Sequence, residues 1–345
     1  MKISKVLIVA TSRKTRGGIT EVVKAHELGF QWKKHHCKWI QTHVDSSPLR
    51  KLLYMGVALL EYVVLLPFYD IVHIHMATKS SVYRKLLFVW LAKILHKKLI
   101  VHFHPPTEKD LFLPISGSVC RYIFRTADKV LVLSEQWKNW IKQAYNVSNN
   151  VTVLYNPCPT VCQVNVEKKK QILFAGTIIL RKGYDVVLHA FAQIANKYPE
   201  WNLVFAGNGE IERAKAICNG LGISNQVQFL GWITGKDKEL TFGCSSIYCL
   251  ASDGEGFPMG VLDAWAYRIP CIVTPVGGIT DIIVNNKNGV IFEVGNVEQL
   301  AAGLEKLILH KDIRDSIVKE TDTIVNSIFN LTVICTELDH IYSTI

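Results

Sequence analysis

Short apolar runs alternate with amphipathic stretches along the first half of the chain. A short, mainly apolar run predicts a buried strand, and apolar positions that recur every three or four residues predict a helix. The predicted strands are residues 6–10, 70–75, 99–104, 130–133 and 151–155. The predicted helices are residues 19–30, 83–96 and 135–145. This alternation is typical of right-handed βαβ units in a parallel sheet.

The same alternation begins again after residues 156–170, which contain two prolines and end in a run of charges. In the second half the predicted strands are residues 171–175, 201–206, 226–230, 246–250 and 271–274. The helices between them are residues 184–197, 210–221 and 259–267. A chain of 345 residues also suits two domains of about 150 residues each. We therefore predict an α/β protein with two doubly wound, Rossmann-like domains, residues 1–160 and 161–325, facing each other across a cleft.

Positive charge is concentrated in the first half. Residues 1–160 hold 23 Lys and Arg against 9 Asp and Glu, whereas residues 161–345 hold 16 against 20. A basic domain suggests an anionic partner, such as lipid headgroups, nucleic acid or a phosphorylated substrate, although a solvated basic face explains the same count. Apolar residues make up 49% of the chain and charged residues 20%, which argues against an intrinsically disordered protein.

Two features bear on where the protein resides, an apolar stretch and the cysteines. Residues 52–69 are almost all apolar, but Glu61 lies in the middle and Pro67 near the end. Because a span needs about 20 apolar residues and a central carboxylate opposes insertion, we expect a buried or surface-lying helix instead. The nine cysteines show no zinc-binding spacing, so we expect no metal site and a reducing, cytoplasmic location.

The most specific motif is residues 252–266, where an apolar strand leads through a loop into a helix. Glu255 lies in the loop, where open α/β sheets bind ligands, and Asp263 lies inside the helix. The helix opens with the amides of Met259, Gly260 and Val261. Such a helix start binds anions, and two flanking acids that bond sugar and ribose hydroxyls suit a nucleotide sugar. A solvated loop acid is the alternative interpretation of Glu255.

A second loop follows the strand at residues 171–175 and ends in Arg181-Lys182-Gly183. Lys182 beside a glycine can reach a diphosphate as a point charge, although most lysines in such a position are simply exposed. The spacing is that of neither a P-loop nor a G-x-G-x-x-G motif. It therefore disfavours a nicotinamide-dependent dehydrogenase.

The first half contributes further candidates. Gly17 and Gly18 follow the first strand and permit close approach of the backbone to a ligand. His104 ends a strand immediately before two prolines, so we expect it to face the cleft. Alternation places His102 on the same face, but a structural role is the safer expectation for a histidine inside a strand.

In their order along the chain, these motifs resemble glycosyltransferase family 4, whose members are retaining enzymes of the GT-B architecture. The resemblance covers nearly the whole chain and includes the Asp-Ile-Val-His-Ile-His strand at 70–75. It also includes Val-Leu-Tyr-Asn-Pro at 153–157, Gly-Asn-Gly at 207–209 and Pro-Val-Gly-Gly-Ile at 275–279. It implies that residues 326–345 form a C-terminal helix that returns to the first domain.

The resemblance also implies a role for each candidate residue. Lys182 should neutralise the donor diphosphate, while Glu255 contacts the donor sugar and Asp263 the ribose. His104 is similar to the family's active-site histidine near the transferred sugar, and the backbone of Gly18 should approach the phosphates. Neither a cofactor nor a metal ion is implied.

Two positions depart from the family pattern. The family often has Glu where this chain has Asp263, which is shorter by one methylene group. Many members have Arg where Thr177 stands, so one expected phosphate partner is missing. Arg181 is the candidate substitute.

The resemblance and the basic first half lead to one hypothesis about function. The chain would transfer a hexose from a UDP or GDP sugar to a saccharide acceptor, lipid-linked, in capsule, exopolysaccharide or lipopolysaccharide assembly. One helix has a basic side and residues 52–69 are apolar, which together suggest that the protein binds an anionic membrane surface. It would then be a peripheral protein on the inner face of the cell membrane. The basic side consists of Lys85, Lys93, His96 and Lys97.

Two alternatives stay open. One is a nucleotide-sugar 2-epimerase, which can share the two-domain architecture. The other is a basic nucleic-acid-binding protein, but the sequence has no aromatic RNA platform and no helix-turn-helix signal. We therefore expect no nucleic-acid partner.

Overall fold

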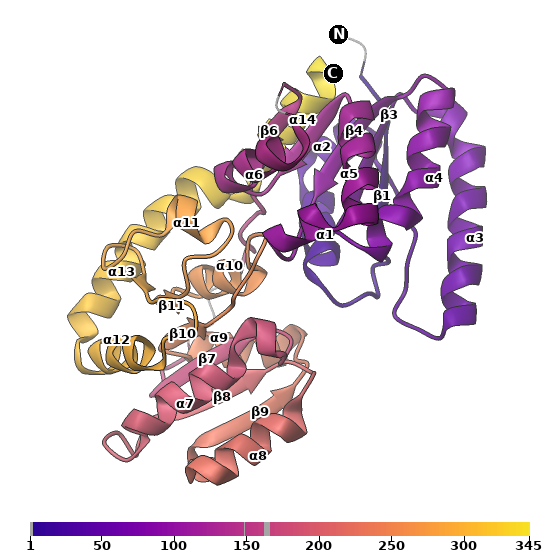
Figure 1. Ribbon diagram of the computed structural model, residues 1–345. Coiled ribbons are helices and arrows are strands. Elements are labelled where there is room, and N and C mark those ends of the chain that lie inside the picture. The colour runs from indigo at the N-terminus through magenta and orange to yellow at the C-terminus, as the bar shows by residue number, and fades with distance from the viewer. Residues whose placement is uncertain (1–2, 148, 162–165) are drawn as a thin grey trace. The chain divides into compact units, whose positions relative to one another are not determined.

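The computed structural model describes residues 3–147, 149–161 and 166–345 (Figure 1). The chain folds as two compact units, here called the N-terminal and the C-terminal unit. The N-terminal unit comprises Met1–Pro157 and Ile328–Ile345, and the C-terminal unit comprises Cys158–Ser327. Residues 162–165, part of the predicted linker, lie outside the described residues.

A parallel sheet in the order β2-β1-β3-β4-β5-β6 forms the centre of the N-terminal unit. Its strands are β1 (Val6–Ala10), β2 (Lys38–Gln41), β3 (Ile71–Met76), β4 (Lys98–Phe103), β5 (Lys129–Val132) and β6 (Val151–Val153). Its helices are α1 (Gly18–Leu28), α2 (Phe30–Lys34), α3 (Pro48–Leu65), α4 (Ser80–Ile94), α5 (Pro114–Thr126), α6 (Glu135–Tyr145) and α14 (Leu331–Thr344). The strand order reverses beside β1, and ligands of doubly wound folds bind at the carboxyl ends of the strands there.

The last helix of the chain completes the core of the N-terminal unit. Ile334, Leu338 and Tyr342 of α14 belong to one buried cluster with Ile8 of β1 and Val23 of α1. The final segment is thus part of the N-terminal unit, although the whole C-terminal unit separates it from β6 along the chain.

The C-terminal unit repeats the architecture, with a parallel sheet in the order β12-β11-β10-β7-β8-β9. Its strands are β7 (Gln171–Ala175), β8 (Asn202–Ala206), β9 (Val227–Gly231), β10 (Ile247–Leu250), β11 (Cys271–Val273) and β12 (Val290–Ile291). Its helices are α7 (Tyr184–Ala195), α8 (Ile211–Leu221), α9 (Gly235–Cys244), α10 (Met259–Ala266), α11 (Ile279–Ile282), α12 (Val297–Leu309) and α13 (Lys311–Ile324). The predicted fold class, two doubly wound α/β sheets, is confirmed.

The apolar stretch predicted at residues 52–69 is helix α3 followed by a short 3-10 turn, Leu66–Phe68. The expectation that this segment is buried is wrong. Its most apolar 18-residue window has a mean hydropathy of 1.7, and only 17% of that window is buried. By length and composition alone the segment could cross a membrane. One face packs on the unit, because Tyr62 is buried and donates a hydrogen bond to the carbonyl of Phe88 at 2.9 Å.

Lys85 does not belong to an exposed basic face, so the predicted grouping with Lys93, His96 and Lys97 is wrong for this residue. Its side chain is 2% exposed, and Nζ donates to the carbonyl oxygen of Val9 at 3.3 Å and to the hydroxyl of Thr42. Among the described residues these neutral groups are the acceptors of its hydrogen bonds. Burial lowers the pKa of Lys85 well below its usual value of 10.5.

Replacing Lys85 with Met should therefore stabilise the N-terminal unit, by about 1 kcal/mol at neutral pH, because an unpaired buried charge is removed. Since the folded-state pKa is lowered, the penalty is greatest at low pH and disappears as pH rises toward 10.5. Thermal unfolding of Lys85→Met and wild type between pH 6 and pH 10 measures this. The exposed Lys142→Met is the control and should change little. A lower melting temperature for Lys85→Met would contradict the prediction.

Candidate functional site

Glu255 lies in the loop that follows β10 and is held there by two partners. Its side chain is buried, and Oε1 forms an ion pair with Nζ of Lys182. The same oxygen accepts a hydrogen bond from the hydroxyl of Ser252, which is itself buried, at 2.6 Å. The Ser252 carbonyl accepts a hydrogen bond from Thr274 Oγ1 at the end of β11. The carboxylate is therefore fixed and charge-compensated at the carboxyl end of the sheet.

The loop after β7 is locked against the loop after β10. A 3-10 turn, Leu180–Lys182, is followed by Gly183, which has a φ of +67° and is the N-cap residue of α7. Arg181 donates to the carbonyl oxygen of Gly254, and the amide of Asp253 donates to the Arg181 carbonyl at 2.9 Å. These contacts explain how two loops that are distant in sequence present Arg181, Lys182 and Glu255 together.

Helix α10 begins directly after this loop. Met259 is its first residue and Pro258 provides no side-chain cap, so its first amides have no acceptor within the helix. Val261 is an exception to the sequence prediction, because its amide donates to the carbonyl of Pro258 at 3.1 Å. A Cβ atom at Gly260 would lie 2.1 Å from the hydroxyl of Tyr248, so a side chain does not fit there. Met259 and Gly260 therefore lie at the start of the helix, as predicted. The amide of Val261 is not available to an anion, because it is already hydrogen-bonded.

Asp263 lies one turn further along α10 and is buried. Its Oδ1 forms an ion pair of 2.7 Å with Nζ of Lys238, from α9. Lys238 could not be identified from the sequence, because residues 235–244 have no regular amphipathic pattern and no helix was predicted there. Thr177, which stands where many family members have a phosphate-binding Arg, is exposed. Arg181, the candidate substitute for that Arg, donates a hydrogen bond to the carbonyl of Gly254.

The candidates of the N-terminal unit form a separate group at the carboxyl edge of its own sheet. Gly18 is the first residue of α1, and Gly17 precedes it with a φ of +149°. His104 follows β4, and its Nε2 lies 3.0 Å from Nδ1 of His75. Its ring is tilted by 34° against that of His102, with centroids 4.3 Å apart, so the two lie on one face as the strand alternation predicts. Burial, aided by His26, lowers the pKa of His104 to about 3, so its imidazole is neutral at physiological pH.

Two family models match adjacent parts of the chain. Glycosyltransferase Family 4 matches residues 22–160, and Glycosyl transferases group 1 matches residues 163–323. Together the two matches cover well over half of the chain, which is therefore a family 4 (group 1) glycosyltransferase.

Relatives of this family 4 glycosyltransferase agree with the match. An uncharacterized glycosyltransferase of Haemophilus influenzae is 31% identical over 192 residues, which cover 54% of each chain. The lipopolysaccharide 1,6-galactosyltransferase of Salmonella typhimurium is 30% identical over 194 residues, which cover 53% of each. These matches therefore span about half the length of the curated relatives.

The fold of the family 4 glycosyltransferase is similar to that of Anabaena HepE, solved in complex with UDP-glucose. The TM-score is 0.77 at 17% identity, over 99% of this chain and 100% of HepE. Since the likeness extends over both units, the chain has the GT-B fold.

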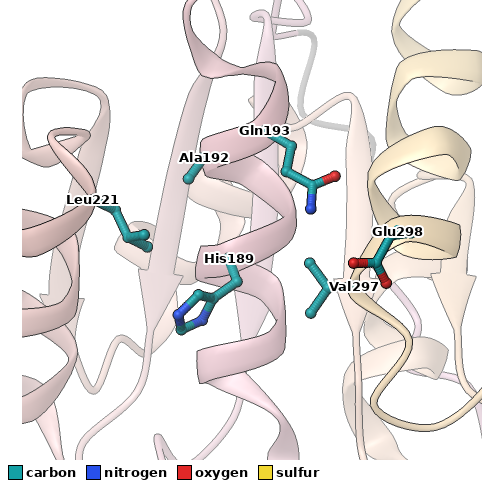
Figure 2. Close-up of a pocket in the computed structure, with 6 residues that line it drawn as sticks. All are labelled: His189, Ala192, Gln193, Leu221, Val297 and Glu298. Atoms are coloured by element: carbon teal, nitrogen blue, oxygen red, sulfur yellow. The ribbon is translucent and has the colours of Figure 1, made fainter.

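A surface pocket of the C-terminal unit lies away from the candidate residues of this glycosyltransferase. Figure 2 shows its lining on α7, on the end of α8 and at the start of α12. The lining residues are His189, Ala192, Gln193, Leu221, Val297 and Glu298. None of the predicted site residues is among them, so the pocket adds nothing to the candidate site.

Proposed function

We propose that this family 4 glycosyltransferase transfers a hexose, with retention, from a UDP or GDP sugar to a saccharide acceptor. The observation that carries the proposal is the pairing of Lys182 with the buried Glu255 beside the start of α10. This places a cation, a carboxylate and helix amides at one end of the sheet, where a charged diphosphate and a sugar would be bound together. The UDP-glucose held by HepE, whose fold is similar, supports a nucleotide-sugar donor.

The mechanism follows from where charge develops. As the bond between the sugar and the diphosphate breaks, negative charge grows on the leaving phosphate and positive charge on the sugar ring. Lys182 and the first amides of α10 would stabilise the former, and Glu255 would bond the sugar hydroxyls. With a donor bound, Lys182 is expected to exchange part of its contact with Glu255 for the phosphate oxygens. His104, as a neutral imidazole, would bond the transferred sugar or the acceptor hydroxyl rather than compete for the anion.

A panel of nucleotides tests the donor site. UDP, GDP and their sugars should include at least one ligand that raises the melting temperature, since a ligand at 100 times its Kd stabilises by about 2.7 kcal/mol. NAD⁺ should give no shift, and Lys182→Ala should lose the shift given by the best ligand. If no nucleotide diphosphate stabilises the chain, the donor proposal fails. A sugar interconverted without an acceptor would identify an epimerase instead.

The acceptor is proposed to be lipid-linked, because α3 and the 3-10 turn that follows it present a stripe of apolar side chains to solvent. Its members are between 46% and 70% exposed and recur every three or four residues. They are Leu49, Leu52, Leu53, Val57, Leu60, Val63, Val64 and Phe68. On a soluble monomer such a patch marks an interaction site.

Charge around the stripe favours an anionic bilayer as its partner. Arg50 and Lys51 are exposed at the start of α3, and Lys97 donates to the carbonyl of Pro67 at the other end. Glu61, the acidic residue within the helix, forms an ion pair with Lys38, with 3.2 Å between Oε1 and Nζ. Helix α4 runs beside α3 (Figure 1) and adds half-exposed Trp90, an aromatic typical of membrane interfaces. The enzyme would thus lie on the inner face of the cell membrane, where a lipid-linked acceptor is available.

Flotation with vesicles tests this surface. Wild type should float with vesicles containing anionic lipid at low salt, and Leu53→Gln/Val57→Gln/Leu60→Gln should bind at least about 10-fold more weakly because apolar side chains no longer insert. The matched control replaces three exposed apolar residues of the C-terminal unit, Leu230, Leu240 and Val294. Equal flotation of the two triple variants, or no flotation of wild type, would refute membrane attachment through α3.

A further inference from the structure

The core of the N-terminal unit contains a cluster of imidazoles for which the proposed transfer reaction has no use. We call it the histidine cluster: His26 of α1, His73 and His75 of β3, and His102 of β4. All four side chains are buried. Register explains the cluster, because His75 pairs directly with His102 across β3 and β4 and His73 points to the same face. The ring of His75 lies 4.6 Å from that of His73 and 4.8 Å from that of His102 between centroids, and the His26 ring lies 6.0 Å from that of His75.

The hydrogen bonds of the cluster leave at least one ring nitrogen of each strand histidine without a partner among the described residues. His73 Nδ1 bonds the hydroxyl of Tyr342 at 2.7 Å, and His75 Nδ1 lies 3.0 Å from His104 Nε2. Nε2 of His73, Nε2 of His75 and both nitrogens of His102 are buried and have no hydrogen-bond partner among the described residues. A histidine whose Nδ1 is held by an outer partner and whose Nε2 is free has the arrangement of a metal ligand.

We propose that the histidine cluster binds one divalent cation of the class that prefers imidazole, such as Zn²⁺ or Co²⁺, through His73, His75 and His102. One nitrogen from each of the three lies within 4.8 Å of the other two. Bonds of about 2.0–2.1 Å to a tetrahedral ion place such nitrogens about 3.4 Å apart, so the rings must close by side-chain rotation. The unpartnered Nε2 of His26 is available beside them.

The chemistry of the cluster selects the ion. An all-nitrogen set suits Zn²⁺, Co²⁺, Ni²⁺ or Cu²⁺ and excludes Mg²⁺ and Ca²⁺, which require oxygen ligands. The spacing of cysteines in the sequence predicts no metal site. The histidine ligands proposed here come together only through the pairing of β3 with β4. It involves none of the donor residues of the C-terminal unit, so it does not rest on the proposed function.

Metal titration of the full chain tests the site. Protein treated with a chelator and dialysed should bind one Co²⁺ per chain, measured by calorimetry and elemental analysis, with the visible absorption of four-coordinate Co²⁺. His73→Gln/His102→Gln should abolish this binding. Tyr342→Phe, which keeps the ring and removes only the outer hydrogen bond, should weaken binding about 10–100-fold. The control His189→Gln/His310→Gln removes two exposed histidines of the C-terminal unit and should bind as wild type does.

Three results would overturn the proposal. The first is binding by wild type no tighter than by His73→Gln/His102→Gln. The second is unchanged affinity in a folded Tyr342→Phe. The third is a crystal structure grown with excess Zn²⁺ in which ordered water alone occupies the open nitrogens. Because these readouts are stoichiometry, absorption and density, they are independent of whether the chain transfers sugar.

Discussion

Lys182→Ala is expected to lower the rate of sugar transfer at least about 100-fold, because one preorganised donor to a developing oxyanion contributes a factor of about 10²–10³. Steady-state transfer from the best nucleotide sugar of the thermal-shift panel measures it. Lys182→Arg keeps the charge and should recover part of the loss. Lys170→Ala, an exposed lysine of the same unit that pairs with Glu200, should act as wild type does.

The same variant also removes the partner of a buried carboxylate, so activity and stability have to be separated. Glu255 is 6% exposed, and an unpaired buried charge costs about 3 kcal/mol. Lys182→Ala should therefore melt lower than wild type. Lys182→Ala/Glu255→Gln should regain most of this stability, since no unpaired charge remains, but should stay inactive. Near-normal turnover in folded Lys182→Ala would show that Lys182 has no part in the transfer.

Those parts of the fold that depend on local pattern could be predicted from the sequence. Strands such as β1 and β10 are buried on both faces, so they appear as continuous apolar runs between helices. The loop with Glu255 could be placed because it follows such a run and precedes a helix. Helix 19–30 was predicted as one element, but it divides at Gly29, whose backbone is extended.

Features that depend on pairing between distant segments could not be predicted. The short β2 has only two buried residues, and the partner of Asp263 comes from the weakly patterned α9. Lys85 appears on a helical wheel as part of a basic face, but the fold turns it toward the carbonyl of Val9. Likewise, the contact of His75 with His102 follows from strand register, which the spacing of histidines along the chain does not determine.

Gly277→Ala is expected to destabilise the C-terminal unit and to abolish donor binding. Gly277 has a φ of +54°, and a Cβ atom there would lie 1.9 Å from the carbonyl oxygen of Glu255. Neither backbone can yield cheaply, because the amide of Gly278 already donates to the carbonyl of Gly256 at 2.9 Å. Strain at a positive φ and the collision together should cost at least about 2 kcal/mol.

The collision falls on the residue that carries the candidate site, so the two effects should appear together. A loss of about 2 kcal/mol lowers the melting temperature by about 4–8 °C in a unit of this size. Displacing the Glu255 backbone would also break the alignment of its carboxylate with Lys182 and Ser252, and the nucleotide-induced shift should vanish even well below the new melting temperature. Gly220→Ala is the matched control: this glycine lies in α8 with nothing near its Cβ position, so Ala should stabilise by about 0.5–1 kcal/mol. If Gly277→Ala keeps both its stability and its nucleotide response, the loop around Glu255 is not packed as described, and the placement of the donor site on it is wrong.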